Sequence, residues 1–126
     1  MQIVKTAIRS KSITIVDDDA LVVPAGETSF VVTSADINVA EYGYGVILIK
    51  AGTETGTATL DVKYQVKGLN GVYYDHTSAT QVTAAGSSIK SISNLDGEIG
   101  RIVVTLGDAA TDAFANVNVE FVIKSR

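Results

Sequence analysis

The chain has 126 residues, of which 46% are hydrophobic and 19% charged, and its formal net charge is −4. This length supports one domain with its own core, and the composition is that of neither a disordered nor a membrane-spanning chain. The acidic balance and scattered basic residues exclude a phosphate-binding surface for nucleic acid, and the absence of cysteine excludes disulfides and thiol chemistry. Val, Ile and Thr are abundant, which favours an all-β fold.

The N-terminal segment predicts two short strands, over residues 2–9 and 12–16. Its apolar residues are interrupted by basic ones, so we expect neither a signal peptide nor a membrane anchor. We interpret residues 1–11 as a candidate extended arm that attracts an acidic partner surface, and a plain edge strand protected by its lysines is the alternative. The candidate partner-binding residues of this segment are Lys5, Arg9 and Lys11.

Three consecutive aspartates, Asp17 to Asp19, predict a solvated turn. A calcium loop is the alternative, because hard cations prefer several oxygen ligands, but the spacing of an EF-hand is missing. We therefore expect no metal here.

The apolar run Val46–Ile49 does not alternate, which is typical of a strand buried on both faces or lying in a subunit contact. Tyr42 and Tyr44 precede this run and complete the set of candidate partner-binding residues. We expect these two tyrosines to pack beside the strand, and a platform for stacking sugars is the alternative.

The clearest pattern in the chain is the alternation over residues 57–67, followed by the turn dipeptide Asn70-Gly71. A period of two predicts a strand with one buried face, and Asn-Gly predicts a tight hairpin turn before the return strand at 72–74. Further short strands are expected at 81–83, 89–92, 101–106 and 115–123, with an Asp-Gly turn at 94–97.

These elements predict one domain over residues 1–126, an all-β antiparallel sandwich of jelly-roll-like form with about eight or nine short strands. The expected core residues are Leu60, Val62, Tyr64, Val104, Val117, Val119 and Phe121. The residues expected to face solvent or a partner are Asp61, Lys63, Gln65 and Asn118.

The sequence offers little catalytic chemistry. Asp75 and the single histidine, His76, are neighbours on a predicted strand, so their side chains point to opposite faces and do not form a dyad. We expect His76 to be exposed at a strand end. One histidine without cysteine leaves no nitrogen or sulfur ligand set for a metal, and no nucleophile elbow is present. We therefore expect a protein that is not an enzyme and holds no cofactor.

The segment from Gly56 to Lys124 resembles small β-rich proteins encoded among the structural genes of tailed phages. Four features carry the resemblance, in this order: a T-A-T-L-D-V opening, a G-V-Y-Y-D hairpin return, the segment Q-V-T-A-A-G-S-S-I-K-S-I, and an R-I-V-V-T-L strand before a final V-x-V-x-F-x-I strand. Where such relatives often have Asp-Gly and then Trp at the hairpin, this chain has Asn70-Gly71 and Tyr73.

The resemblance implies a capsid decoration (cement) protein that binds and stabilises the major capsid protein on the virion surface after synthesis in the host cytoplasm. It also implies a homo-oligomer, with a trimer favoured. The acidic charge and the lack of a long apolar run predict partners that include neither nucleic acid nor membrane. The alternative is a carbohydrate- or host-binding module of a phage tail or head fibre. Its stacking residues would be Tyr42, Tyr44, Tyr73 and Tyr74.

Overall fold

The computed structural model describes residues 9–125, and within that range the chain forms ten strands and no helix that could cross a membrane. The strands are β1 (Ser10–Val22), β2 (Phe30–Thr33), β3 (Ile37–Asn38), β4 (Tyr44–Ala51), β5 (Glu54–Thr55), β6 (Thr59–Lys67), β7 (Tyr73–Ser78), β8 (Gly86–Ile92), β9 (Ile99–Gly107) and β10 (Ala113–Lys124).

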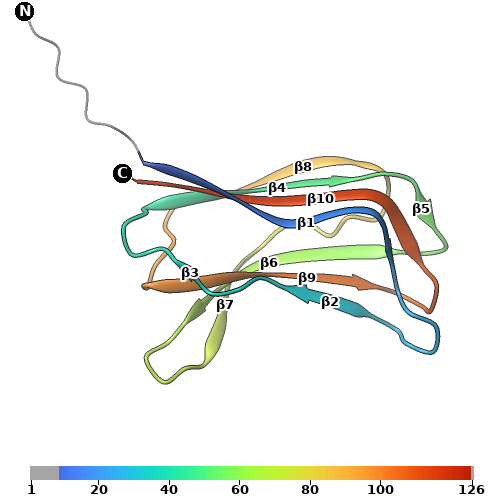
Figure 1. Ribbon diagram of the computed structural model, residues 1–126, viewed down its shortest axis with the longest axis horizontal. Helices are drawn as coiled ribbons and strands as arrows, with labels where there is room; N and C mark the ends of the chain where they lie inside the picture. The colour runs from blue at the N-terminus through green and yellow to red at the C-terminus, as the bar shows by residue number, and fades with distance from the viewer. Residues whose placement is uncertain (1–8, 126) are drawn as a thin grey trace, which may run out of the picture.

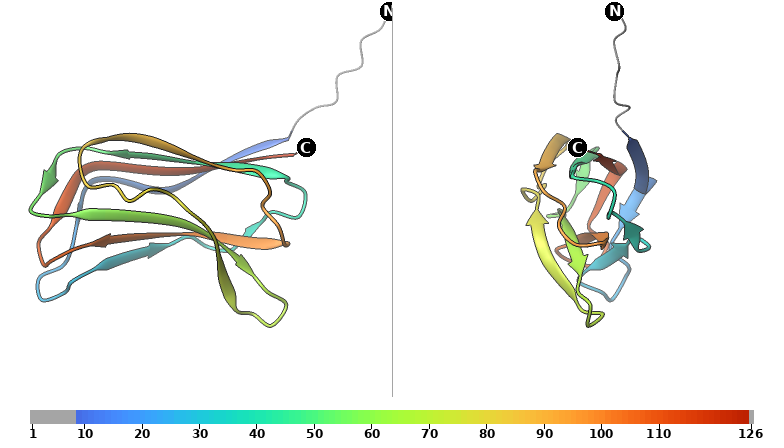
Figure 2. Two further views of the ribbon diagram at one scale, coloured as in Figure 1. Left: turned by 180° about the vertical axis from the view of Figure 1, so that it is seen from behind. Right: turned by 90° about the vertical axis from the view of Figure 1, so that its left-hand side faces the viewer.

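The strands lie in two antiparallel five-stranded sheets that face each other (Figures 1 and 2). Sheet A has the order β1-β10-β4-β8, with β5 also paired to β10, and sheet B has the order β2-β9-β6-β7, with β3 also paired to β9. Eight strands remain when the two-residue strands β3 and β5 are set aside. The first of these pairs with the last (β1 with β10), and the next pairs inward are β2 with β9, β4 with β8, and β6 with β7. This nested pairing is the arrangement of a jelly roll. The predicted all-β, jelly-roll-like sandwich is confirmed, with two additional strands of two residues each.

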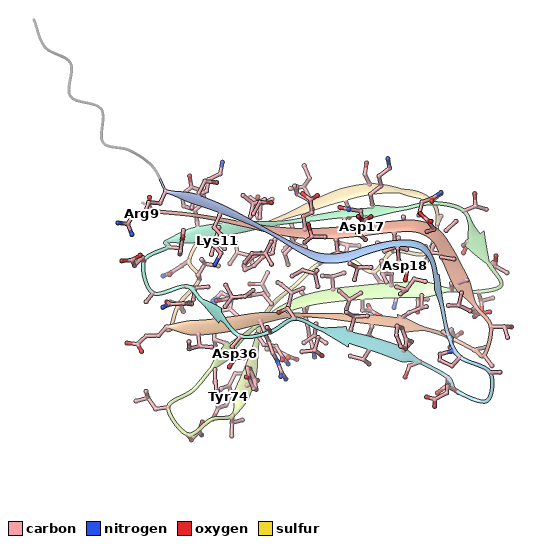
Figure 3. The ribbon with its side chains drawn as sticks, viewed as in Figure 1. Arg9, Lys11, Asp17, Asp18, Asp36 and Tyr74 are labelled. Carbon is pink, nitrogen blue, oxygen red and sulfur yellow. The ribbon has the colours of Figure 1, made fainter. Side chains whose placement is uncertain are left out.

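The first strand is longer than the sequence predicts. Residues 10–22 form one strand, so the turn predicted at Asp17 to Asp19 is wrong. The backbone of β10 accounts for the difference, because Asp17 pairs with Asn118 and Asp18 with Val117 while the carboxylates stay exposed. Neighbouring side chains alternate between the faces of a strand, which separates these carboxylates (Figure 3).

The core lies between the two sheets and contains every residue predicted for it. Leu60, Val62, Tyr64, Val104, Val117, Val119 and Phe121 are each 1% exposed or less. The rings of Tyr64 in sheet B and Phe121 in sheet A meet with their centroids 5.4 Å apart. The Tyr64 hydroxyl donates a hydrogen bond of 2.9 Å to the carbonyl of Leu95, so the polar tip of this buried ring has a partner.

A glycine makes room for that ring. A Cβ atom at Gly100 would lie 2.5 Å from Cε1 of Tyr64, so a larger residue in β9 would displace the tyrosine. Burial, to which the nearby Asp96 charge adds, raises the pKa of Tyr64 to about 12. The phenol is therefore neutral and able to donate at neutral pH.

The predicted hairpin joins β6 to β7 and extends beyond the rest of sheet B (Figure 1). Gly71 has φ +81°, a conformation that glycine adopts without steric cost, and its amide donates to the carbonyl of Gly68 at 2.9 Å. The Asn70 side chain accepts a hydrogen bond from the amide of Val72 at 3.0 Å. The Asn-Gly prediction is confirmed here.

Truncating Phe121 to Ala should lower the free energy of unfolding by about 3–5 kcal/mol, because the ring is fully buried at the contact between the sheets. The adjacent Val122→Ala change, on the outer face of the same strand, should cost about 1 kcal/mol or less. Urea unfolding of the two variants measures both values. A loss below about 1 kcal/mol for Phe121→Ala would show that the ring does not hold the sheets together.

Candidate interaction surface

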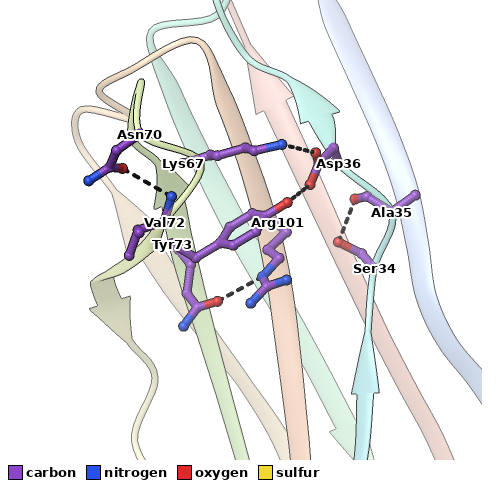
Figure 4. A network of polar contacts seen from close by, with 9 residues as sticks. Ser34, Ala35, Asp36, Lys67, Asn70, Val72, Tyr73 and Arg101 are labelled. Atoms are coloured by element: carbon purple, nitrogen blue, oxygen red, sulfur yellow. Dashed lines mark hydrogen bonds and ion pairs between the residues drawn. The ribbon is translucent and has the colours of Figure 1, made fainter.

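The outer faces of the two sheets differ in how far their polar side chains are paired. On sheet B, seven side chains form one connected set, which we call the sheet B network; Figure 4 shows the part of it around Asp36, Lys67, Tyr73 and Arg101. Its members are Asp36, Lys63, Gln65, Lys67, Tyr73, Asp75 and Arg101. They come from β6, β7, β9 and the segment before β3, so the network ties the projecting hairpin to the sheet.

Tyr73 lies at the centre of the network. Its hydroxyl donates to a carboxylate oxygen of Asp36, and the Arg101 guanidinium stacks 3.4 Å from the centroid of its ring. Lys67 Nζ lies 3.2 Å from the other oxygen of Asp36. The hydrogen bond from Tyr73, followed by the Lys67 ammonium, holds the pKa of Asp36 below its ordinary value.

Gln65 lies deeper than predicted. It is on the outer face but only 9% exposed, because neighbouring polar side chains cover its carboxamide. Arg101 Nε donates to Gln65 Oε1 at 2.8 Å, and Gln65 Nε2 donates to Asp75 Oδ1 at 2.7 Å. That second bond, together with Lys63 Nζ 3.0 Å from Asp75, lowers the pKa of Asp75.

His76 is not at an exposed strand end, and that expectation is corrected. It lies within β7 with its side chain 20% exposed, and its ring meets the edge of Tyr64 with centroids 5.3 Å apart. Nε2 lies 2.7 Å from Oδ2 of Asp96, and Nδ1 lies 2.6 Å from Oγ1 of Thr77. Asp75 points instead into the sheet B network, as alternation on a strand requires.

The outer face of sheet A has an apolar centre. The β4 side chains of Ile47 and Ile49 enter the core, while Val46 and Leu48 point outward and stay half-buried. Their outward neighbours across the ladder are Val122 in β10, which pairs with Val46, and Ile89 in β8, which pairs with Leu48. Ile89 is 71% exposed. The run Val46–Ile49 is therefore buried on one face and forms an open apolar surface on the other.

Polar residues surround this centre. The outward positions around it are occupied by the uncharged residues Ser12, Thr14, Ser87, Ser91 and Asn118 and by two carboxylates, Asp17 and Glu120. Glu120 pairs directly with Leu48. A shallow hollow of about 490 Å³ lies among Leu48, Lys50, Ile89 and Asn118. We call the apolar centre, Val46, Leu48, Ile89 and Val122, together with this polar border the sheet A face.

The lysines also distinguish the two sheets. Among residues 9–125, Lys63 and Lys67 of sheet B are both in ion pairs. The lysines of that range that form no ion pair or side-chain hydrogen bond all lie in strands of sheet A: Lys11, Lys50, Lys90 and Lys124. These lysines are free to pair with carboxylates of a partner, and they share the sheet with the outward carboxylates of Asp17 and Glu120.

The structure gathers most of the predicted partner-binding residues at one end of sheet A. Lys5 lies outside the described residues. Arg9 and Lys11 lie at the start of β1 (Figure 3), where Arg9 Nη1 forms an ion pair of 2.6 Å with Glu41. Tyr44 begins β4 and pairs with Lys124, whose other neighbour is Ser10. Tyr42 packs against the core, as expected.

The four tyrosines of the carbohydrate-binding alternative do not form one platform. Tyr42 packs on the core and Tyr73 belongs to the sheet B network. Tyr74 is half-exposed, with its hydroxyl bonded to the Asn70 side chain at 3.0 Å, and it is a strand neighbour of Tyr73, which places it on the opposite face. No group of three His, Asp or Glu residues within the described range is placed to hold a metal ion.

Sequence reasoning missed the apolar centre of the sheet A face. Val46 and Leu48 belong to one apolar run of the sequence, but Ile89 and Val122 lie on strands far away in the sequence. The available signal was an apolar residue at an outward position: Ile89 among serines and Val122 on the polar face of β10. Only the strand order brings these positions together.

No protein-family model matches the chain, and no curated protein matches it in sequence. In structure it is similar to the SPBc2 prophage-derived protein YomS, with a TM-score of 0.57, 14% identity, and 98% of this chain and 100% of that chain covered. A chain from infectious bursal disease virus (Gx strain) gives a TM-score of 0.63 at 12% identity, covering 96% of this chain but 33% of that longer chain. A chain from Bacillus endospore appendages, a family of disulfide-linked pili, gives 0.54 at 16% identity, covering 99% and 97%. At these identities the similarity establishes a shared fold.

The sheet B network predicts a loss of stability in acid. Because the folded-state pKa values of Asp36 and Asp75 are lowered, their contribution is present above the unfolded-state values and disappears as the pH falls through the folded-state values. The free energy of unfolding should therefore fall below about pH 4. An Asp36→Asn, Asp75→Asn variant should be less stable at pH 7 and show a shallower decline in acid.

Asp19→Asn is the matched control, because Asp19 is exposed in β1 and lies outside the network. Urea unfolding at pH 7, 5, 4 and 3 gives the three profiles. Equal acid slopes for the wild type and the double variant would contradict the proposed role of the network.

Proposed function

We propose that this protein is a structural component of a phage particle, and specifically a decoration protein that binds the major capsid protein through the sheet A face. The observation that carries the proposal is the apolar centre of that face, bordered by polar residues that include Glu120 and by unpaired lysines. Support for a particle setting comes from the fold shared with a prophage-derived protein over the whole chain and with part of a virus chain.

The sheet A face has the anatomy of a protein–protein contact. Stable interfaces have an apolar centre with few charges and a polar, solvent-accessible rim. Val46, Leu48 and Val122 are held in the middle of a sheet, so they lose little conformational freedom when a partner covers them. The serines and threonines around them can hydrogen-bond to a partner without the cost of burying a charge.

Lys50 and Lys124 lie at opposite ends of this face, on strands β4 and β10. They form no ion pair within the described residues, so they are available to carboxylates on a capsid surface. Lys11, at the N-terminal end of β1, would add to this attraction. Several copies joined in a homo-oligomer would bind the shell at more than one point, which raises the effective affinity and stabilises the assembled shell.

Leu48→Lys tests the apolar contact. It should abolish cosedimentation with shells of the parent phage's major capsid protein, although it adds a positive charge, because the contact requires apolar burial. Thr105→Lys is the matched control, since Thr105 is a half-buried outward residue of β9, the corresponding central strand of sheet B. Retained binding by Leu48→Lys, or equal loss in both variants, would contradict docking through sheet A.

The lysines predict a salt dependence that can be measured separately. Binding of the wild type should weaken as salt rises from 50 to 500 mM, roughly in the manner of screened surface charges. A Lys50→Gln, Lys124→Gln variant should bind less tightly at low salt and respond less to salt. If this variant responded to salt as the wild type does, Lys50 and Lys124 would not be the source of the electrostatic attraction to the capsid.

A further inference from the structure

The edge strand β8 is less protected against pairing than the other edges of the sandwich. Sheet edges expose unpaired backbone groups, and proteins block them with bulges, charges or very short strands. Among the described edges, β1 has a register irregularity between Thr14 and Val16, followed by three aspartates. The edge strand β7 pairs irregularly with β6 at Tyr64 and Gln65. The edge strand β2 has only four residues. By contrast, β8 pairs with β4 over seven residues in continuous register.

The outward positions of β8 are symmetric about the centre of the strand. Ile89 is the middle residue of the strand Gly86–Ile92, and the outward positions on either side of it are Ser87 and Ser91. Only one residue of the strand, Lys90, is charged. An antiparallel partner of the same sequence would therefore meet matching side chains on the outer face.

We propose that β8 pairs antiparallel with β8 of a second copy, about a two-fold axis at Ile89. In this register Ile89 lies opposite Ile89 of the second copy, and Ser87 opposite Ser91. Two apolar side chains directly across from each other stabilise a sheet, and paired hydroxyls can hydrogen-bond. Lys90 lies opposite Ser88, so no like charges face each other directly. The contact is self-complementary, which is the requirement for a closed two-fold interface.

Pairing of this kind would join two A sheets into one continuous sheet. The half-buried Leu48 borders Ile89 in each copy, so the apolar centre would continue across the axis. The proposal is independent of what the sheet A face binds. It also differs from the trimer expected from the sequence, because a two-fold contact closes at two copies.

The absence of cysteine from the chain permits a direct test. In an Ile89→Cys variant the two introduced thiols would be cross-strand neighbours, with Cβ atoms about 4.5–5.5 Å apart, close to the range for a disulfide. Mild oxidation should convert most of this variant to a covalent dimer on a non-reducing gel. Leu69→Cys, fully exposed at the hairpin turn, is the control for random collision. Equal rates for the two variants would overturn the proposal.

Mass measurement in solution provides the second readout. The wild-type chain of 13.2 kDa should sediment as a dimer. Ile89→Lys should remain folded by circular dichroism and weaken the dimer by roughly 30-fold or more, as loss of a central contact does. Lys90→Gln should tighten it, because the two Lys90 side chains lie diagonally across the axis. A monomeric or trimeric wild type, or a dimer that Ile89→Lys leaves intact, would overturn the proposal.

Discussion

The contact between Tyr64 and Phe121 is the constraint on which the rest of the structure depends. It joins the central strands of the two sheets, with ring centroids 5.4 Å apart, and the hydrogen bond from Tyr64 to Leu95 fixes the ring in place. Because a strand alternates its side chains, inward placement of these two residues determines which positions of β6 and β10 face outward. A shift of one residue in the pairing register of either strand would turn its core side chains to the outer face.

The two outer surfaces produced in this way have different physical properties. On sheet B, the carboxylates of Asp36 and Asp75 already have cationic and hydrogen-bonding partners within the chain. A binding partner would have to replace those bonds. On sheet A, four neighbouring outward side chains are apolar, and the lysines and Glu120 beside them form no ion pair within the described residues. Covering this surface therefore removes apolar area from water and breaks no internal ion pair. The sheet A face is for this reason the stronger candidate for contact with another protein.

Much of the fold could be predicted because it follows from local alternation. The pattern over residues 57–67 and the Asn70-Gly71 turn identified β6, its buried face and the hairpin, and the pattern near Phe121 identified β10. Prediction failed where a distant strand decided the outcome. Asp17 to Asp19 continue β1 because β10 supplies backbone partners, and Gln65 is covered because Arg101 reaches it from β9. The apolar centre of the sheet A face joins β4, β8 and β10, so it requires the strand order.

The central claim is that sheet A, and not sheet B, meets the capsid shell. The most direct measurement is an electron cryomicroscopy reconstruction of the particle with the protein bound. The account predicts that Val46 and Val122 lie against the shell and that the β6–β7 hairpin points away from it. A map in which the hairpin or the sheet B network makes the contact, with the sheet A face open to solvent, would contradict the account.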